Sequence, residues 1–311
     1  MKNKVIVFGS TGYLGVNLCS FFESNNVQFS RALRKGVNYN KLSPNSVFYD
    51  INNQKELSKL LNDFDVILFA AGLNQEKCEF VEDSININVI SLVKVLEASI
   101  DSEIKTFIYL STIQVYDSIL ESNYNESSEV LNLKPYALSK IIAEKYLNFY
   151  SKKNKFKVII NRLSNCFSSY NNLYNINKKL VLNDFCFNAI LNKEIIVKSK
   201  KNISKNFLPM SIFLKYIYFQ IYNYNQKNYF EIFNLGAFSN HNLYEIANKI
   251  KYLVKNEFNY DVRLSFSSDF EMDTNQFLFS TEKINNYISI EYSFDNEILN
   301  FLKLIKSYNE D

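Results

Sequence analysis

The chain has 311 residues, of which 47% are hydrophobic and 22% are charged, and its formal net charge is +3. This composition is typical of a soluble protein with one large or two modest domains, and the small charge argues against nucleic acid as a partner. Four cysteines without a CxxC pair and a single histidine argue against a zinc site, so no metal is expected. The first apolar run, Val5 to Phe8, is too short for a signal peptide, which indicates a cytoplasmic protein.

The first half of the chain alternates short apolar runs with amphipathic segments. This alternation predicts an α/β fold with a parallel, doubly wound sheet. Strands are expected at Val5–Phe8, Val27–Leu33, Val47–Tyr49, Val66–Ala70, Phe107–Leu110 and Val158–Ile160. Helices are expected at Tyr13–Glu23, Lys55–Asn62, Val81–Ser99 and Pro135–Tyr150.

The pattern is less regular after about Asn165, where Ser168–Asn177 reads as a loop. The apolar stretch Phe207–Tyr222 is shorter than a bilayer requires, so it predicts a buried helix after Pro209; contact with a membrane surface is the alternative. His241 is expected to be a surface or loop residue. Further helices are expected at Leu180–Leu191 and Leu243–Lys255, and strands at Ile195–Lys198 and Phe230–Leu235.

Three glycines, Gly9, Gly12 and Gly15, directly follow the first predicted strand and open the first predicted helix. Glycine permits a sharp turn and a close approach of the backbone to a pyrophosphate. The N–H groups and positive dipole end of the helix favour phosphates. The motif predicts a dinucleotide cofactor, and a plain tight turn is the alternative.

The residues after the second predicted strand indicate which dinucleotide binds. An NAD enzyme usually has an acidic residue about 20 positions after the glycines, whereas an arginine there suits the 2′-phosphate of NADP. This region contains Arg31, Arg34 and Lys35 and no acidic residue. We therefore expect NADP in preference to NAD; a solvated basic loop is the alternative.

A tyrosine, a lysine and a threonine form the candidate catalytic set. Tyr136 and Lys140 are four residues apart on a predicted helix and so share one face. A neighbouring cation lowers the pKa of a phenol, which suits Tyr136 to exchange a proton with a substrate oxygen. Thr112 follows the Phe107–Leu110 strand at the sheet edge that binds ligands, so its hydroxyl could donate to the same oxygen. A structural, strand-capping role for Thr112 is the alternative.

Together these features resemble the extended short-chain dehydrogenases/reductases, the family of NAD-dependent epimerases and dehydratases that act on nucleotide sugars. The resemblance covers most of the chain. Besides the glycines, the matching segments are Ala70-Ala71-Gly72, Asn88, Ser111-Thr112 with Val115-Tyr116, Pro135-Tyr136 with Ser139-Lys140, Arg162 with Asn165, Asn183-Asp184-Phe185 and Phe233-Asn234-Leu235-Gly236. It implies a Rossmann-like domain over residues 1–165. Residues 166–311 would form a smaller, irregular substrate domain, from which segments around 195–240 return to the sheet.

The motifs and the resemblance together give the expected sites. The catalytic residues are Tyr136, Lys140 and Thr112. The residues expected to bind the cofactor are Gly9, Thr11, Gly12, Tyr13, Leu14, Gly15, Arg31, Arg34, Lys35, Asp50, Ile51, Ala70, Ala71, Gly72, Asn88, Leu110, Tyr136 and Lys140. The residues expected to bind the nucleotide sugar are Thr112, Ile113, Gln114, Asn165, Asn183 and Lys205.

Departures from the family pattern narrow the function. Sugar 4,6-dehydratases of this family carry two acidic residues, or a close variant of that pair, just after the catalytic threonine. Ile113 and Gln114 stand here, and neither can ionise. The resemblance therefore implies a 4-keto-sugar reductase or a C4 epimerase in surface polysaccharide biosynthesis, and disfavours a dehydratase. A non-catalytic, NADP-binding regulatory or scaffold protein on the same fold is the alternative.

Two single positions, Lys205 and Ser168, also differ from the family pattern. Lys205 stands where the family has an arginine that touches the nucleotide phosphates, and Ser168 stands where glycine is common. The helices near Val81–Ser99 and Pro135–Tyr150 resemble the pair that family members pack into a two-fold interface. A homodimer is therefore expected.

Overall fold

The structure is a computed structural model that describes residues 3–39, 42–116, 123–153, 155–200, 202–225, 227–267, 270–271 and 278–310. The chain forms two compact units. Unit 1 comprises Met1–Asp117, Glu126–Leu163 and Ile217–Phe233, and unit 2 comprises Ser118–Asn125, Ser164–Tyr216 and Asn234–Asp311.

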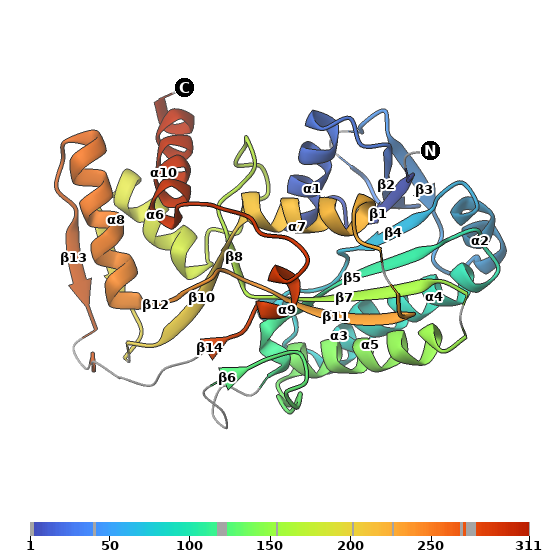
Figure 1. The fold of residues 1–311 in the computed structure, drawn as a ribbon. Coiled ribbons are helices and arrows are strands. Elements are labelled where there is room, and N and C mark those ends of the chain that lie inside the picture. The colour runs from blue at the N-terminus through green and yellow to red at the C-terminus, as the bar shows by residue number, and fades with distance from the viewer. Residues whose placement is uncertain are drawn as a thin grey trace. The chain divides into compact units, whose positions relative to one another are not determined.

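Unit 1 is built on a seven-stranded sheet with the order β11-β7-β5-β4-β1-β2-β3 (Figure 1). Phe8 lies in parallel register between Ala32 and Phe69, where the strand order reverses. Such a reversal opens a crevice for a ligand at the carboxyl ends of the strands. The predicted doubly wound parallel sheet is thereby confirmed. Its strands are β1 (Val5–Phe8), β2 (Phe29–Arg34), β3 (Ser46–Tyr49), β4 (Val66–Phe69), β5 (Thr106–Thr112), β7 (Lys157–Leu163) and β11 (Phe230–Leu235).

Helices cover both faces of this sheet (Figure 1). On one face, Phe21 of α1 contacts Tyr218 of α7, with ring centroids 6.1 Å apart. The apolar side chains of β1, β4 and β5 pack against the helices of the other face, where Phe69 stacks on both Phe8 and Phe107. The helices are α1 (Tyr13–Ser24) and α7 (Met210–Tyr222) on the first face, and α2 (Gln54–Leu61), α3 (Val81–Ile85), α4 (Ser91–Ile100) and α5 (Pro135–Ser151) on the second.

Two details of unit 1 differ from the sequence prediction or refine it. The helix expected over Val81–Ser99 contains a π-helical turn, η2 (Asn86–Ile90), between α3 and α4. A π turn adds a residue to the helical repeat and often marks a functional site. Two single 3₁₀ turns, η1 (Gln75–Lys77) and η3 (Ile113–Val115), follow β4 and β5.

Unit 2 has its own apolar core, between α6 (Val181–Leu191), α8 (Leu243–Phe258) and α10 (Phe294–Glu310). Three small sheets have the orders β12-β10-β8, β13-β9 and β14-β6. Their strands are β6 (Asn123–Tyr124), β8 (Asn165–Phe167), β9 (Glu194–Val197), β10 (Ser204–Pro209), β12 (Asn240–Asn242), β13 (Arg263–Phe266) and β14 (Leu278–Phe279); the short helix α9 (Glu282–Asn285) follows β14.

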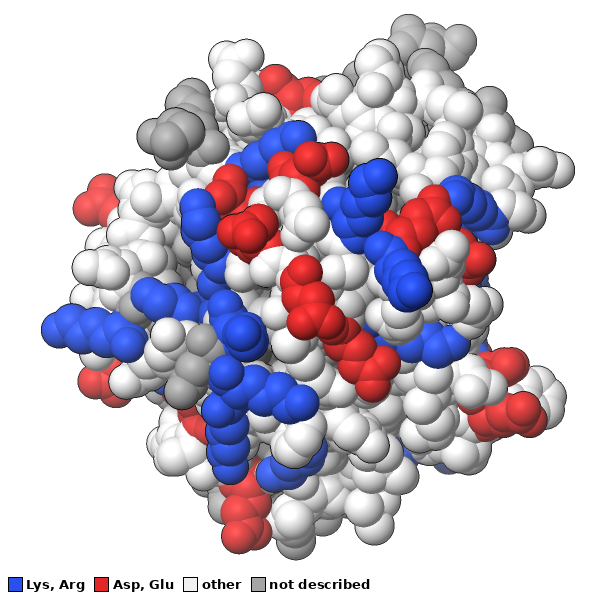
Figure 2. Space-filling view, turned by 90° about the vertical axis from the view of Figure 1, so that its right-hand side faces the viewer, with Lys and Arg blue, Asp and Glu red and all other residues white. Residues whose placement is uncertain are grey.

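The apolar stretch that ends at Tyr222 forms the buried helix that its sequence predicts. It begins directly after Pro209, and Phe213, Leu214 and Ile217 are fully buried. No helix among the described residues is long and apolar enough to cross a bilayer. On the molecular face in Figure 2, Lys and Arg side chains lie among Asp and Glu side chains. Ion pairs of unit 1 such as Arg31–Glu23 and Lys105–Asp65 agree with this mixed surface.

Candidate active site

The glycine turn between β1 and α1 allows three pieces of backbone to come into close contact. Gly9 has φ +80°, and a Cβ atom there would lie 2.5 Å from the backbone nitrogen of Ala71. A Cβ atom at Gly15 would overlap the carbonyl oxygen of Gly9. The Gly12 N–H donates to that same oxygen at 3.0 Å. The sequence therefore needs glycine here so that the first turn of α1 can pack against the end of β1.

The turn presents the N-terminus of α1 at the carboxyl edge of the sheet. Gly12 caps this helix without a side-chain hydrogen bond, and the first turn within Tyr13–Ser24 carries no acidic residue. The positive end of the helix dipole is therefore not neutralised by a carboxylate of its own first turn. A cradle lined by glycine and without a first-turn carboxylate fits the pyrophosphate of a dinucleotide.

A second wall of the site follows β4, and Asn88 holds it. The Asn88 side-chain oxygen accepts a hydrogen bond from the Leu73 N–H at 2.6 Å, just after Ala70-Ala71-Gly72. Its amide donates to the hydroxyl of Ser139 at 2.9 Å, and Ser139 donates to the carbonyl of Tyr136. The π turn thus directs Asn88 toward both the turn after β4 and the start of α5.

The expected catalytic set comes together in unit 1. The Nζ atom of Lys140 donates to the carbonyl of Leu110 at 3.0 Å and lies over the rings of Tyr109 and Tyr136, 4.8 and 6.0 Å from their centroids. The Thr112 side chain is hydrogen-bonded to Tyr136. Two hydroxyls and one ammonium therefore converge at the end of β5.

Burial controls the ionisation of this set. It lowers the pKa of Lys140 to about 8 and raises the pKa of Tyr136 to about 12, although the hydrogen bond with Thr112 lowers the Tyr136 value. The sequence predicts the reverse for Tyr136, because it shows the neighbouring cation but not the loss of water around the phenol. At neutral pH the set is therefore a neutral phenol beside an ammonium group.

Ile113 and Gln114 follow Thr112 in the turn η3. The Thr112 hydroxyl oxygen accepts a hydrogen bond from the Gln114 N–H at 3.2 Å, which caps the turn. Thr112 thus has a structural role as well, as the alternative interpretation expected. Neither residue brings a carboxylate to this position.

The three cations after β1 have different surroundings. Arg31 lies within β2 opposite Val7 and donates to Glu23, and Lys35 is paired with Glu56. Arg34 is the last residue of β2 and is hydrogen-bonded to Tyr49, with no carboxylate partner in the part of the chain that the structure describes. Arg34 therefore stands at the carboxyl edge, whereas Arg31 does not.

Asp50 and Ile51 directly follow β3, at the same edge of the sheet. The Asp50 carboxylate accepts a hydrogen bond from the Asn52 N–H at 2.9 Å. Ile51 packs against the core cluster of unit 1. Both residues thus stand where the second half of a dinucleotide would be held in a doubly wound sheet.

Outside the catalytic set, the residues expected to bind the sugar nucleotide are divided between the units: Ile113 and Gln114 lie in unit 1, and Asn165, Asn183 and Lys205 lie in unit 2. Asn165 donates to the carbonyl of Asn206, and Asn183 accepts from the Ser168 N–H at 3.0 Å. Burial lowers the pKa of Lys205. Ser168 has φ +74°, a left-handed conformation that explains why glycine is common at this position in the family.

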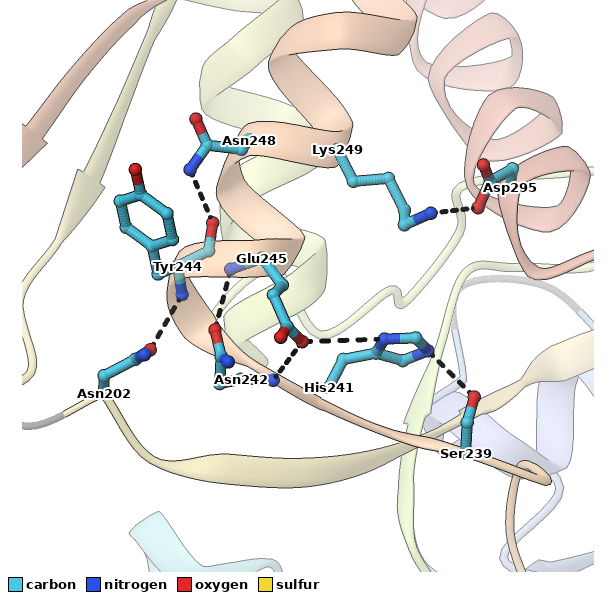
Figure 3. Close-up of polar contacts among 9 residues, drawn as sticks. All are labelled: Asn202, Ser239, His241, Asn242, Tyr244, Glu245, Asn248, Lys249 and Asp295. Carbon is cyan, nitrogen blue, oxygen red and sulfur yellow. Dashed lines mark hydrogen bonds and ion pairs between the residues drawn. The ribbon is translucent and has the colours of Figure 1, made fainter. Parts of the chain in front are cut away.

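His241 is expected to be a surface or loop residue, and its side chain is 20% exposed. It belongs to the short strand β12, and its ring stacks on Phe294 with centroids 4.5 Å apart. Figure 3 shows the imidazole between Ser239, 3.0 Å from Nε2, and Glu245, 4.0 Å from Nδ1. Glu245 forms the capping box of α8 with Asn242. The cluster therefore organises the start of α8.

Sequence reasoning missed three residues beside the catalytic set. Cys78 is buried, and its sulfur lies 3.6 Å from the amide of Asn88. Tyr109 lies under Lys140. Glu144 is four residues after Lys140 on α5, a spacing that indicates a shared helix face. Among the described residues, no group of three or more His, Cys, Asp or Glu side chains is placed to hold a metal ion.

Fold and site together define a class: a doubly wound, Rossmann-like fold with a glycine turn after its first strand and a Thr–Tyr–Lys set at the end of its fifth strand. Residues 5–236 match the model of the NAD dependent epimerase/dehydratase family. The chain belongs to this family, as the sequence motifs predicted.

Curated relatives match only parts of the chain. A dTDP-D-glucose 4,6-dehydratase from Homo sapiens is 32% identical over 108 residues, which are 34% of this chain and 31% of that protein. The low-salt glycan biosynthesis protein Agl12 from Haloferax volcanii is 27% identical over 175 residues, or 52% of this chain and 56% of that protein. The chain thus spans about a third to just over half of the length of these relatives.

Solved structures are similar over the whole chain. The UDP-glucuronic acid 4-epimerase from Bacillus cereus, in complex with UDP-glucuronic acid and NAD, has a TM-score of 0.79 at 17% identity and covers 98% of this chain and 99% of its own. The UDP-glucose 4-epimerase from Thermotoga maritima, with UDP-glucose, has a TM-score of 0.82 at 15% identity, with the same coverage. At these identities the likeness establishes the fold.

Proposed function

We propose that the protein catalyses a redox reaction at C4 of a nucleotide-activated sugar, as a 4-keto-sugar reductase or a C4 epimerase of surface polysaccharide biosynthesis. The observation that carries the proposal is the convergence of Thr112, Tyr136 and Lys140 at the carboxyl end of β5, in the same unit as the glycine turn. Ligands of doubly wound sheets bind at this edge.

The residues of unit 1 fit a nicotinamide dinucleotide. Gly9, Gly12 and Gly15 would hold its pyrophosphate against α1, and Asp50 with Ile51 would hold the adenosine half. Ala70-Ala71-Gly72, Asn88, Leu110 and Lys140 would line the nicotinamide ribose. When bound, the nicotinamide supplies or accepts the hydride at the sugar carbon.

The chain's own residues handle the proton. Tyr136 would donate its phenolic proton to the sugar oxygen or recover it, while Thr112 holds a hydrogen bond to the same oxygen. Lys140, oriented by the Leu110 carbonyl, would stabilise the phenolate that forms when Tyr136 gives up its proton. These three roles suffice for oxidation and reduction at a single carbon.

The same residues argue against dehydration. Elimination of water needs a general acid and a general base near the sugar. Ile113 and Gln114 supply neither, although the dTDP-D-glucose dehydratases are among the relatives by sequence. UDP-sugar 4-epimerases are among the proteins that are similar in structure.

A preference for NADP(H) over the family's NAD is a finer part of the proposal. Arg34 supports it, because it ends β2 at the ligand edge without a carboxylate partner among the described residues. Titration of NADPH and NADH by calorimetry tests this preference. Arg34→Glu should weaken the binding of NADPH more than the binding of NADH. Equal affinities for the two cofactors in the unaltered protein would contradict the preference.

A role in substrate binding for three residues of unit 2 is likewise a proposal. Asn165, Asn183 and Lys205 would contact the nucleotide sugar, with Lys205 as a point charge for its phosphates. Lys205→Met should then raise KM for the nucleotide sugar and leave the affinity for the nicotinamide cofactor unchanged.

Incubation with nucleotide sugars and both nicotinamide cofactors tests the function itself. UDP-glucose, UDP-glucuronic acid and a 4-keto nucleotide sugar are suitable first substrates, with products identified by NMR. Inversion at C4 without net change in nicotinamide absorbance identifies an epimerase, and net consumption of reduced cofactor identifies a reductase. Formation of a 4-keto-6-deoxy sugar would contradict the proposal, and cofactor binding without turnover of any substrate would favour the scaffold alternative.

A further inference from the structure

A buried ion pair lies next to the catalytic set and has no role in the mechanism above. Arg162 of β7 and Glu144 of α5 form it, with a shortest N–O distance of 2.7 Å and side-chain exposures of 4% and 5%. The guanidinium also donates through Nε at 3.2 and 3.3 Å, so the contact is bidentate. A buried ion pair is weak evidence for stability, because apolar residues of similar volume often serve as well. This pair therefore calls for another explanation.

The pair connects the segments that carry the catalytic residues. Ser111, directly before Thr112, donates to Glu144 at 2.6 Å. Arg162 donates to the hydroxyl of Tyr116, at the end of the turn that follows Thr112, at 2.8 Å. Side chains on both sides of Thr112 are thus hydrogen-bonded to the same ion pair, and Glu144 belongs to the helix that carries Tyr136 and Lys140.

The pair also sets the charge around Lys140. The Nζ atom of this lysine lies over the rings of Tyr109 and Tyr136, and Glu144 follows the lysine by four residues on α5. Burial lowers the pKa of Lys140, and the charges of Cys78 and of the Glu144 carboxylate oppose this by raising it. Arg162 holds an equal and opposite charge against that carboxylate.

We infer that the Glu144–Arg162 pair is a positioning element of the active site, which orients Thr112 through Ser111 and keeps the charge beside Lys140 in balance. The inference rests on the proposed roles of Thr112, Tyr136 and Lys140. Neither member of the pair touches the substrate; both act through the residues that do.

The charge balance predicts opposite effects for two single variants. Glu144→Gln leaves the Arg162 cation unpaired and should lower the pKa of Lys140 by about one pH unit. Arg162→Met leaves the Glu144 carboxylate unpaired and should raise it by a similar amount. A loss of packing alone would not move the pKa of Lys140 in opposite directions.

The titration of Lys140 can be measured without turnover. Protein labelled with 15N at the lysine Nζ atoms is titrated by NMR, with the Lys140 resonance assigned by its absence in Lys140→Met. Asp65→Asn is the matched control, because it removes one carboxylate from an ion pair on the surface of the same unit and should shift nothing. Shifts of the Lys140 pKa in opposite directions in the two variants support the inference. Shifts in the same direction, or no shift, overturn it. Neither result depends on whether Tyr136 is essential.

A milder variant covers the case in which an unpaired buried charge prevents folding. Ser111→Ala keeps both charges and removes only the link to Thr112. It should lower kcat at least tenfold, with unchanged KM for the cofactor and an unchanged Lys140 titration. Full kcat in Ser111→Ala, in a protein that Tyr136→Phe inactivates, would overturn the positioning role while leaving the proposed function intact.

Discussion

Burial of Tyr136 and Lys140 has a chemical consequence at the scale of single residues. With pKa values near 12 and 8, the phenol keeps its proton at neutral pH while the ammonium is close to losing its own. In the proposed function Tyr136 would therefore donate its proton, and Lys140 would stabilise the phenolate that results. Direct donation to a keto oxygen suits the reductive direction.

Substitutions in the catalytic set should follow a definite order. Tyr136→Phe removes only the phenolic oxygen, so folding and cofactor binding should survive while kcat falls roughly 10²–10⁴-fold. Thr112→Val should slow turnover less, because one neutral hydrogen-bond donor is lost. Gln114→Ala should be mild, because no proton transfer is assigned to it. Steady-state kinetics with the identified substrate measures all three, and a Gln114→Ala defect as large as that of Tyr136→Phe would undo the argument against dehydration.

Lys140→Met should stabilise the cofactor-free protein while it abolishes turnover. Burial lowers the pKa of Lys140 from 10.5 to about 8. This shift costs roughly 1–3 kcal/mol of folding free energy below pH 8, after allowance for the hydrogen bond to Leu110 that the variant loses. Between pH 8 and 10.5 the unfolded chain binds more protons, so the unaltered protein gains stability as pH rises through this window and the gap to the variant closes.

Urea denaturation at pH 7 and pH 10 measures this effect. A variant less stable than the unaltered protein at pH 7 would mean that Lys140 is not desolvated as the structure indicates. Lys140→Met should also bind the cofactor more weakly and shift any residual activity to higher pH, because the phenol loses its neighbouring cation.

At the scale of elements, the glycine turn is the part of the site that tolerates change least. Gly15→Ala would place a Cβ atom on the carbonyl oxygen of Gly9 and force α1 away from β1. We expect loss of cofactor affinity by at least tenfold and a lower free energy of unfolding. Gly36→Ala is the control for introducing a methyl group outside the cradle: nothing lies within 4 Å of its Cβ, although its φ of +76° costs some stability. Calorimetry and thermal melts compare the two, and unchanged cofactor affinity in Gly15→Ala would contradict the assignment of the cradle.

Helices and strands could be predicted from the sequence where a single local signal, such as an apolar run or a proline, marks their start. The buried strands β1 and β11 and the helix α5 begin where apolar runs or Pro135 indicate. The π turn around Asn88 was not predictable, because a single extra residue leaves the apolar periodicity of the helix nearly unchanged. The short strands of unit 2, such as β8 and β12, consist of three residues each, too few for an alternating pattern.

The residues of the candidate catalytic set could be predicted from the sequence, but their pKa values could not. Thr112, Tyr136 and Lys140 belong to motifs whose strand and helix context is legible in the sequence. Cys78 and Tyr109 reach the same place only through folding, and no spacing indicates them. The raised pKa of Tyr136 depends on burial, which the local sequence does not reveal.

At the scale of the whole molecule, the exposed apolar side chains on two neighbouring helical segments agree with the expected dimer. Phe80 and Val81 at the start of α3 are 71% and 62% exposed, and Phe149 of α5 is 56% exposed. Ile90 and Tyr146 add to the apolar surface of the same segments. Exposed apolar surface of this kind is typical of a protein interface.

Light scattering at micromolar concentration should therefore give the mass of two chains. A variant with both Tyr146→Lys and Phe149→Lys should be monomeric, because buried charges without partners oppose association. Tyr252→Lys, an equally drastic change at an exposed position of α8, is the control and should leave the dimer intact. A monomer in the unaltered protein would contradict the prediction.

The strand β11 has a consequence for the synthesis of the protein. It completes the sheet beside β7, yet it is encoded far downstream, after α6 and α7. While the ribosome makes the intervening residues, β7 remains an open edge with unpaired N–H and C=O groups, which is a template for pairing with other chains. A nascent chain that stalls or is cleaved in this interval would expose that edge, together with the apolar residues of α7, to aggregation. Because the sheet of unit 1 is completed by β11, a strand that is synthesised late, we expect the risk of aggregation to be greatest during translation.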